Sequence, residues 1–395
     1  MKSSKLKLWL GSDALPGNAA AVSDMVDTAI KGGVDTFEAA PEIVAALRKY
    51  PRESYRLFSR CDIYGLGSSD AGDRLEQRRA RLGIDRFDFF MLTYLNEATA
   101  DFAYDEERQL MALEEKRRQG AVGHVGVYFS GGFKALKAFL DKYRESVEFC
   151  SIQLNYMDWS LQRAREKAGI LRDIGLPVIA AKPLRGGLLG NLPPELEAEL
   201  RAVRCDDSPL NWGINWLKAQ DAAAAIVDAR CKDELAAYIR ASLLGKELSP
   251  DEQCLLYYVA GELRHIEEAP PCTDCRHCAG VCPAGLEVPF YIDLLTDLKV
   301  RRDESLVRQY RSLPPERRAS ACIGCFKCAA SCPKGIPVPL LMAELEDITA
   351  SGGVGDATAW IFDALPKGRD PLPRPPLFGI SALFGLGPPP HHPGP

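Results

Sequence analysis

The chain has 395 residues, of which 46% are apolar and 26% charged, and its net charge at pH 7 is −5. This composition is typical of a globular protein and excludes a disordered or fibrous chain. The negative charge argues against nucleic-acid binding through a bulk positive field. The sequence contains neither an apolar run of the roughly 20 residues that a membrane helix needs nor a recognisable secretion signal. We therefore expect a cytoplasmic protein without a membrane span.

Short apolar segments alternate with amphipathic segments over the first 245 residues. Two of the amphipathic segments, Asp105–Gly120 and Gly131–Ser146, have clear helical periodicity. Eight such repeats in about 240 residues predict an α/β fold, a closed (β/α)8 TIM barrel. A doubly wound open sheet is the alternative, but the glycine-rich turn that usually follows its first strand is missing. The predicted strands are Leu8–Ser12, Val34–Ala40, Tyr55–Cys61, Phe87–Thr93, Val122–Phe129, Phe149–Tyr156, Pro177–Leu184 and Ala223–Ala229.

The sequence pattern changes near residue 248, where the strand and helix alternation stops. We therefore expect a barrel domain at residues 1–247, a helical domain at residues 248–350 and a tail at residues 351–395. The tail holds 10 Pro and 8 Gly among 45 residues, which is typical of an extended or disordered segment. Its apolar stretch Leu377–Gly387 either covers the protein's own surface or docks a partner.

The 13 cysteines fall into a scattered class and a grouped class. Without export, a disulfide framework is not expected, and grouped cysteines indicate metal or cluster ligands. Eight of them form two copies of the motif C-x2-C-x2-C-x3-C-P, from Cys272 to Pro283 and from Cys322 to Pro333. The scattered cysteines are expected to be small buried side chains: Cys61, Cys150, Cys205, Cys231 and Cys254.

The repeated cysteine motif is typical of proteins that hold two [4Fe–4S] clusters. Three thiolates of each loop converge on one cluster, and the fourth cysteine, before the proline, ligates the other cluster. Zinc is the alternative, but it usually takes two CxxC pairs. The helical sequence between the motifs predicts an α-helical dicluster ferredoxin domain. The predicted ligands are Cys272, Cys275, Cys278 and Cys332 for one cluster, and Cys322, Cys325, Cys328 and Cys282 for the other.

Several segments of the barrel region resemble successive strand motifs of the aldo/keto reductases. They are GGVDTFEAA, RLGIDRFDFFML, LEEKRRQGAVGHVGVYF, SIQLNYMD and VIAAKPLRGGLL. The resemblance covers roughly residues 5–245, and the cysteine-rich region resembles that of a subgroup with a fused ferredoxin domain. It implies a barrel that binds a nicotinamide cofactor at its C-terminal face and reduces carbonyls with an Asp, a Tyr, a Lys and a His.

The catalytic residues of that family are replaced at the matching positions of this chain. The Asp falls on Glu38, the proton-donating Tyr on Ile43, the Lys on Arg60 and the His on Thr93. Isoleucine carries no proton, and an arginine does not give up its own. The usual hydride-plus-proton mechanism therefore lacks its acid.

Most residues that the resemblance implies for nicotinamide binding are also replaced. The Ser-Asn pair falls on Tyr128 and Phe129, and the aromatic that stacks on the ring falls on Ala181. Only Gln153 matches, and Arg230 remains as a candidate for attracting a phosphate. We therefore do not assign an NAD(P)H cofactor, and we expect negligible NADPH-dependent reduction of simple aldehydes. A second organic cofactor stays unidentified.

Polar and titratable residues nevertheless follow the predicted strands, where barrel enzymes perform their chemistry. We take Arg60, Tyr128, Tyr156 and Lys182 as candidate catalytic residues. The phenols are potential acids and the cations potential anion clamps. The alternatives are that Arg60 pairs with Glu38 and that Lys182 is solvated or salt-bridged.

Two functions of different class follow from these features. The first is an iron–sulfur oxidoreductase that passes electrons through two clusters to a small-molecule substrate or second cofactor at the barrel mouth. The second is a non-catalytic electron-transfer subunit that docks on a partner oxidoreductase. Both require an electron donor or acceptor protein. The first predicts an enclosed pocket near a cluster, and the second an exposed cluster edge beside an apolar patch.

Overall fold

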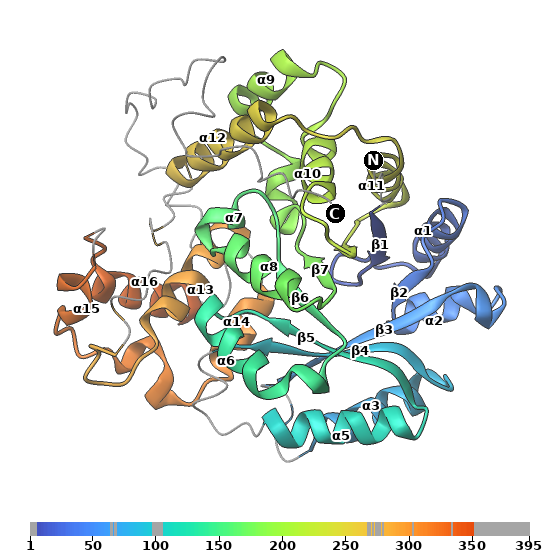
Figure 1. The fold of residues 1–395 in the computed structure, drawn as a ribbon, viewed down its shortest axis with the longest axis horizontal. Helices are drawn as coiled ribbons and strands as arrows, with labels where there is room; N and C mark the ends of the chain where they lie inside the picture. The colour runs from blue at the N-terminus through green and yellow to red at the C-terminus, as the bar shows by residue number, and fades with distance from the viewer. Residues whose placement is uncertain are drawn as a thin grey trace, which may run out of the picture.

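A closed barrel of eight parallel strands, joined in chain order, forms the first part of the chain (Figure 1). The computed structural model describes residues 6–63, 66, 69–96, 106–266, 270, 272, 278, 280–301, 304–332 and 335–350. All eight predicted strands are confirmed, and β8 pairs with β1 to close the sheet. The strands are β1 (Lys7–Leu10), β2 (Thr36–Glu38), β3 (Arg56–Asp62), β4 (Phe87–Leu95), β5 (Val122–Phe129), β6 (Phe149–Gln153), β7 (Val178–Ala181) and β8 (Ala224–Val227).

Helices surround the barrel because each connection between parallel strands must cross back along the outside of the sheet. The barrel helices are α1 (Ala19–Lys31), α2 (Pro41–Leu47), α3 (Ala71–Leu82), α5 (Glu106–Arg118), α6 (Phe133–Tyr143), α7 (Asp158–Leu161), α8 (Ala164–Asp173), α9 (Pro194–Val203), α10 (Pro209–Lys218) and α11 (Lys232–Leu244). Short 3-10 turns are η1 (Arg52–Ser54), η3 (Arg144–Ser146) and η4 (Arg185–Gly190).

The periodicity of the sequence explains how these helices pack. In α6, the side chains of Leu136, Phe139 and Leu140 are buried against the barrel, while Phe133 and Tyr143 are half-buried at its ends. Asn18 is the N-cap of helix α1, and its side chain accepts a hydrogen bond from the Ala21 N–H.

Apolar side chains fill the barrel interior beneath its C-terminal end. Trp9, Phe58, Met91, Phe149 and Ile179 are buried there and pack together. The barrel is therefore a packed core, and only its C-terminal end is left to form a site.

A set of helices follows the barrel, and we call residues 250–350 the cluster region because they include both cysteine motifs. Its elements are α12 (Pro250–Ile266), α13 (Val288–Arg301), α14 (Glu304–Arg311), η5 (Pro315–Arg317), η6 (Ala319–Ala321), α15 (Lys327–Ala330) and α16 (Val338–Ala350). Helix α13 contacts η4, which follows β7, so this region lies beside the C-terminal ends of the strands (Figure 1). None of the described helices is long and apolar enough to cross a membrane.

The scattered cysteines do not all behave as predicted. Cys61, Cys150 and Cys254 are buried, whereas Cys205 and Cys231 are exposed. The prediction was wrong for these two because both stand in short polar connections, where no apolar layer covers them.

Candidate active site at the barrel mouth

A cavity of about 540 Å³ opens at the C-terminal end of the barrel. We call it the mouth cavity. Tyr128 and Ala181 form part of its lining from within the barrel. Its charged lining residues are Asp13, Glu38, Arg60, Asp62, Arg78, Arg81, Lys182, Asp228 and Arg308. Arg308 belongs to α14, so the cluster region contributes directly to the mouth.

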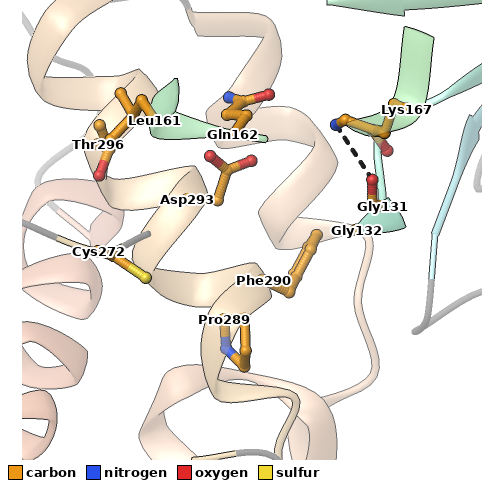
Figure 2. Close-up of a pocket in the computed structure, with 11 residues that line it drawn as sticks. Gly131, Gly132, Leu161, Gln162, Lys167, Cys272, Pro289, Phe290, Asp293 and Thr296 are labelled. Carbon is orange, nitrogen blue, oxygen red and sulfur yellow. Dashed lines mark hydrogen bonds between the residues drawn. The ribbon is translucent and has the colours of Figure 1, made fainter. Parts of the chain in front are cut away.

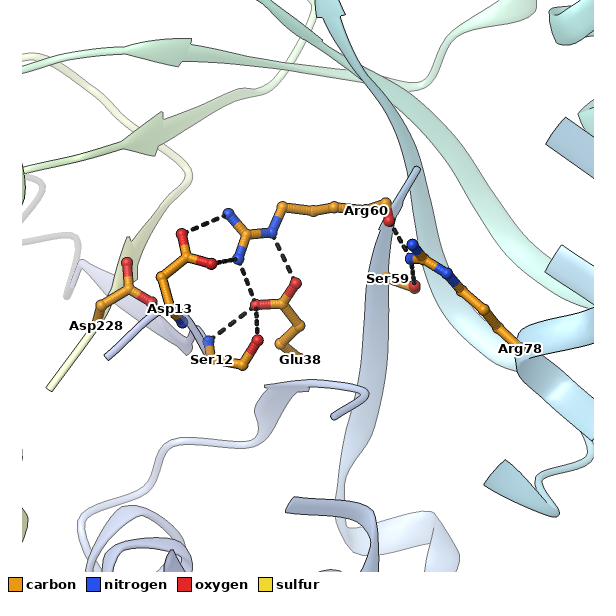
Figure 3. Close-up of polar contacts among 7 residues, drawn as sticks. All are labelled: Ser12, Asp13, Glu38, Ser59, Arg60, Arg78 and Asp228. Atoms are coloured by element: carbon orange, nitrogen blue, oxygen red, sulfur yellow. Dashed lines mark hydrogen bonds and ion pairs between the residues drawn. The ribbon is translucent and has the colours of Figure 1, made fainter. Parts of the chain in front are cut away.

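The Arg60 guanidinium is held between two carboxylates (Figure 3). Its Nε donates to Glu38 Oε1 at 2.7 Å and its Nη2 to Glu38 Oε2 at 2.6 Å. Its Nη1 and Nη2 also donate to the Asp13 carboxylate at 3.0 and 2.7 Å. The predicted Arg60–Glu38 pair is therefore confirmed, and Asp13 is an addition that the sequence reading missed.

This pairing fixes the charge of Arg60. Burial lowers the pKa of Arg60, but the Glu38 and Asp13 carboxylates outweigh it and raise the pKa well above its ordinary value. Ser12 adds to this hydrogen-bonded group of side chains, because its N–H and its hydroxyl both donate to Glu38 Oε2. A guanidinium already bound to two carboxylates positions its neighbours and has no free fork for a substrate anion.

Asp228 adds a third carboxylate to the same mouth. Burial raises its pKa to about 6, and the nearby Asp13 and Glu38 charges add to this effect while Arg60 opposes it. The Asp13 N–H donates to Asp228 Oδ1 at 3.1 Å, which keeps the carboxyl at the opening. The mouth therefore changes its charge near neutral pH.

Lys182 stands at the end of β7 in an unusual backbone conformation. Its φ is +51°, in the left-handed region that side chains other than glycine seldom adopt. The Asn155 side-chain amide donates to the Lys182 carbonyl at 3.1 Å and supports this turn. Residues held in such a conformation cluster at functional sites. The conformation therefore makes Lys182 a candidate functional residue among the basic residues of the mouth.

A second cavity of about 360 Å³ shares Asp13, Lys182, Asp228 and Arg308 with the first. We call it the side cavity. Arg230 lines it but is bound to Glu234, with Nε 3.2 Å from Oε2. Arg230, which we predicted to attract a phosphate, therefore lines a cavity next to the mouth.

Tyr156 and Gln153 were both expected at the mouth, and the structure places them elsewhere. Tyr156 is fully buried outside the mouth cavity, and burial raises the pKa of its phenol. The expectation fails because β6 ends at Gln153, so Tyr156 lies beyond the strand, packed toward α10. Gln153 donates to Asp158 Oδ2 at 2.7 Å and is likewise covered.

Asp158 and Arg185 form a buried pair beneath these residues. Both side chains are fully covered, and Arg185 Nη2 lies 3.4 Å from Asp158 Oδ1. Asn155 also donates to Asp158 Oδ2, at 2.6 Å. Because removing one partner of a buried pair is costly, this group fixes the β6 and β7 connections on which the cluster region rests.

A third, smaller cavity lies between the barrel and the cluster region (Figure 2). We call it the interface cavity. Cys272, Phe290 and Asp293 line it from the cluster region. On the barrel side, buried Lys167 donates from Nζ to the Gly131 carbonyl at 3.2 Å, in the loop that follows β5. A predicted cluster ligand thus meets the strand-end loops of the barrel.

Thiols from both cysteine motifs lie near Cys328, while the assignment of each cysteine to a cluster stays a prediction. Burial raises the pKa of the Cys328 thiol, and the nearby thiols of Cys322 and Cys282 add to this effect. Cys282 belongs to the first motif and the other two to the second, so the donor set fits a [4Fe–4S] cluster shared between motifs. The described His, Cys, Asp and Glu side chains form no group of three close enough for a single ion. Cys275 and Leu377–Gly387 lie outside the described residues.

Three functional candidates escaped the sequence reading. Asp13 lies beyond the end of β1, and the pairing of β1, β2 and β3 brings it to Arg60. Arg308 and Lys167 approach their cavities through the docking of two regions far apart in the chain. No local spacing carries that information.

A profile of the aldo/keto reductase family matches residues 9–248. The chain belongs to the aldo/keto reductase family. A 4Fe-4S dicluster domain profile matches residues 264–333. This family member therefore joins an aldo/keto reductase barrel to a 4Fe-4S domain.

Known relatives agree with the family and the fold. "Uncharacterized oxidoreductase YrpG" of Bacillus subtilis (strain 168) is 28% identical over 149 residues, which are 37% of this chain and 44% of that protein. The chain thus matches less than half the length of this curated relative.

Solved aldo-keto reductases share the barrel. The thermostable Tm1743 has a TM-score of 0.54 at 21% identity, over 64% of this chain and 94% of its own. AKR11C1 of Bacillus halodurans has a TM-score of 0.52 at 19% identity, over 64% and 91%. An enzyme of Klebsiella pneumoniae, solved with NADPH, has a TM-score of 0.52 at 17% identity, over 63% and 89%.

Proposed function

We propose that this aldo/keto reductase-family protein is an iron–sulfur oxidoreductase that reduces a small molecule at the barrel mouth. The observation that carries the proposal is the position of the cluster region: Cys272 meets the loop after β5, and Arg308 lines the mouth cavity. When bound, two [4Fe–4S] clusters supply two electrons, one each, to a substrate that also takes up two protons.

The chain's own residues suit binding and proton supply at the mouth. Lys182 and Arg308 line the mouth cavity from the end of β7 and from α14, and their positive charges attract an anionic group of the substrate. Tyr128 lines the same cavity, and its phenol can donate a proton to the substrate. Tyr156 is fully buried away from the cavity and does not take this role.

The residues at the family's catalytic positions support a departure from NAD(P)H chemistry. Ile43 is fully buried and Thr93 lies at the mouth without an ionisable group, while Glu38 and Arg60 neutralise each other. The Asp228 carboxylate lines both the mouth cavity and the side cavity, and it repels an anionic cofactor group when ionised.

The electron source distinguishes this function from that of an ordinary aldo/keto reductase. We expect protein with both clusters to reduce its substrate with reduced methyl viologen and to give no product with NADPH. A screen of small carbonyl and unsaturated acids, read by mass spectrometry, identifies that substrate. Turnover with NADPH by the Cys272→Ser variant, stripped of its clusters, would overturn the proposal.

A non-catalytic electron-transfer subunit remains the second candidate, because a cysteine loop of the second motif is exposed beside apolar side chains. The two functions differ at the mouth. Substitution of Lys182 leaves the transfer function of a subunit intact and removes the turnover of an enzyme.

A further inference from the structure

The second cysteine loop carries an unusual surface. The five consecutive residues Ile323–Lys327 are all exposed, and we call them the outer loop. Ile323 is 68% exposed and Phe326 is 48% exposed, although both are large and apolar. Cys325, a predicted cluster ligand, lies between them and is exposed as well.

Neighbouring elements extend this apolar surface. Leu340 of α16 is 62% exposed, and α16 contacts α15, whose first residue, Lys327, is the last residue of the outer loop. Val281, 36% exposed, precedes Cys282, whose thiol is near that of Cys328. Exposed apolar side chains from three segments around one group of cysteines indicate an interaction surface.

The flank of the outer loop is basic, although the whole chain has a net charge of −5. Residues 311–332 contain four basic residues and one acidic residue. Lys327 is exposed within the loop itself. Arg318 donates from Nε to the Leu313 carbonyl and from Nη2 to the Arg311 carbonyl, contacts that orient its charge without neutralising it.

The two cysteine groups face different ways. Cys272 lines the interface cavity against the barrel, whereas the outer loop is on α15, at the outer edge of the molecule (Figure 1). A partner on the outer loop would therefore approach one cluster while the other faces the barrel.

We propose that the outer loop, with Val281 and Leu340, is the docking surface for a small acidic one-electron carrier protein. The proposal rests on the proposed function for the direction of electron flow. The carrier loses one electron and is oxidised, and the cluster held by the Cys322 motif gains that electron and is reduced; no bond forms and no proton moves. The basic flank accelerates encounter, and the apolar side chains exclude water at contact.

The test is anaerobic stopped-flow reduction of the full-length protein with both clusters. The probe is a reduced, acidic plant-type [2Fe–2S] ferredoxin, and dithionite is the small-molecule control. Ile323→Ser/Phe326→Asn should lower the second-order rate constant with the ferredoxin about tenfold and leave the dithionite rate unchanged. Asparagine is chosen because Phe326 has a φ of +58°, which asparagine tolerates.

Three further variants keep the result interpretable. Leu340→Gln, outside the cysteine loop, should slow the ferredoxin reaction about threefold, and Lys327→Glu should slow it at low salt but little at high salt. Met111→Ser, an equally exposed apolar residue on α5, should have no effect. Iron and sulfide contents establish that each variant retains its clusters.

Cluster reduction needs no substrate at the mouth, so this test is independent of whether the proposed function is right. Wild-type rates with ferredoxin in all outer-loop variants would overturn the docking proposal. It is also overturned if the double variant changes only the sedimentation mass, because the surface then joins two copies of this chain.

Discussion

Arg60 makes a paired contact with Glu38, through two hydrogen bonds of 2.7 and 2.6 Å, across neighbouring strands at the mouth of the barrel. This contact turns two residues at the family's catalytic positions into a fixed ion pair. It also leaves the Arg60 guanidinium without a free fork for a substrate anion, so we assign anion binding to other cations that line the mouth cavity, Lys182 and Arg308.

The ion pair predicts a specific loss of stability. Arg60→Met leaves Glu38, Asp13 and Asp228 as neighbouring carboxylates, and we expect the free energy of unfolding of the barrel to fall by about 2–3 kcal/mol. This is less than for a fully buried pair, because the Arg60 side chain is 26% exposed. Urea denaturation followed by tryptophan fluorescence measures it.

The control for this change is Arg230→Met, which breaks an exposed pair with Glu234 and should cost below about 1 kcal/mol. Adding Glu38→Gln to Arg60→Met should restore part of the loss. Equal stabilities for Arg60→Met and Arg230→Met would contradict the assignment of Arg60 as the residue that balances the carboxylates at the mouth.

The sequence was sufficient to predict the barrel and the 4Fe-4S domain, but only part of the mouth. Strand period and cysteine spacing are local properties, so β1 to β8 and both motifs could be placed. Tyr156 was misplaced because one or two residues past a strand end decide whether a side chain points to the mouth or to the helix layer. Arg308 is found only once α14 has docked.

Asp228 makes anion binding at the mouth depend on pH. Its pKa of about 6 means that the carboxylate is charged above that pH and neutral below it. We expect NADP⁺ to bind weakly at pH 8, and Asp228→Asn to tighten binding about tenfold at pH 8 with little effect at pH 5. Isothermal titration calorimetry checks this, with exposed Asp173→Asn as the matched control.

The same residue affects stability in the opposite direction from most carboxylates. Because the folded protein raises the pKa of Asp228 above its ordinary value of 3.8, its favourable contribution is present below that value and is lost as the pH rises through about 6. Asp228→Asn should therefore stabilise the protein above pH 6. Stabilisation only at pH 4 would show that Asp228 is not held in this environment.

Lys167 places a buried ammonium in the interface cavity that Cys272 also lines. A nearby positive charge stabilises the reduced, more negative form of a cluster. Lys167→Met should lower the reduction potential of one cluster, and Lys167→Arg should preserve it. A redox titration followed by electron paramagnetic resonance reads both clusters, and equal potentials in all three proteins would remove Lys167 from this role.

Crossed ligation predicts which cluster each cysteine disturbs. Cys332→Ser should lose the same paramagnetic signal as Cys272→Ser, although Cys332 belongs to the other motif. Cys322→Ser should lose the second signal, and exposed Cys205→Ser should lose none. If Cys332→Ser behaved like Cys322→Ser instead, each motif would hold its own cluster.

The most direct test of cluster-fed reduction at the mouth is single-turnover re-oxidation. Protein reduced with one electron per cluster is mixed anaerobically with small anionic oxidants and followed by its visible absorption. We predict that at least one compound re-oxidises the wild-type protein, and that Lys182→Ala slows this at least tenfold while ferricyanide re-oxidises both proteins equally. Equal rates for wild type and Lys182→Ala with every compound would contradict a reaction at the barrel mouth.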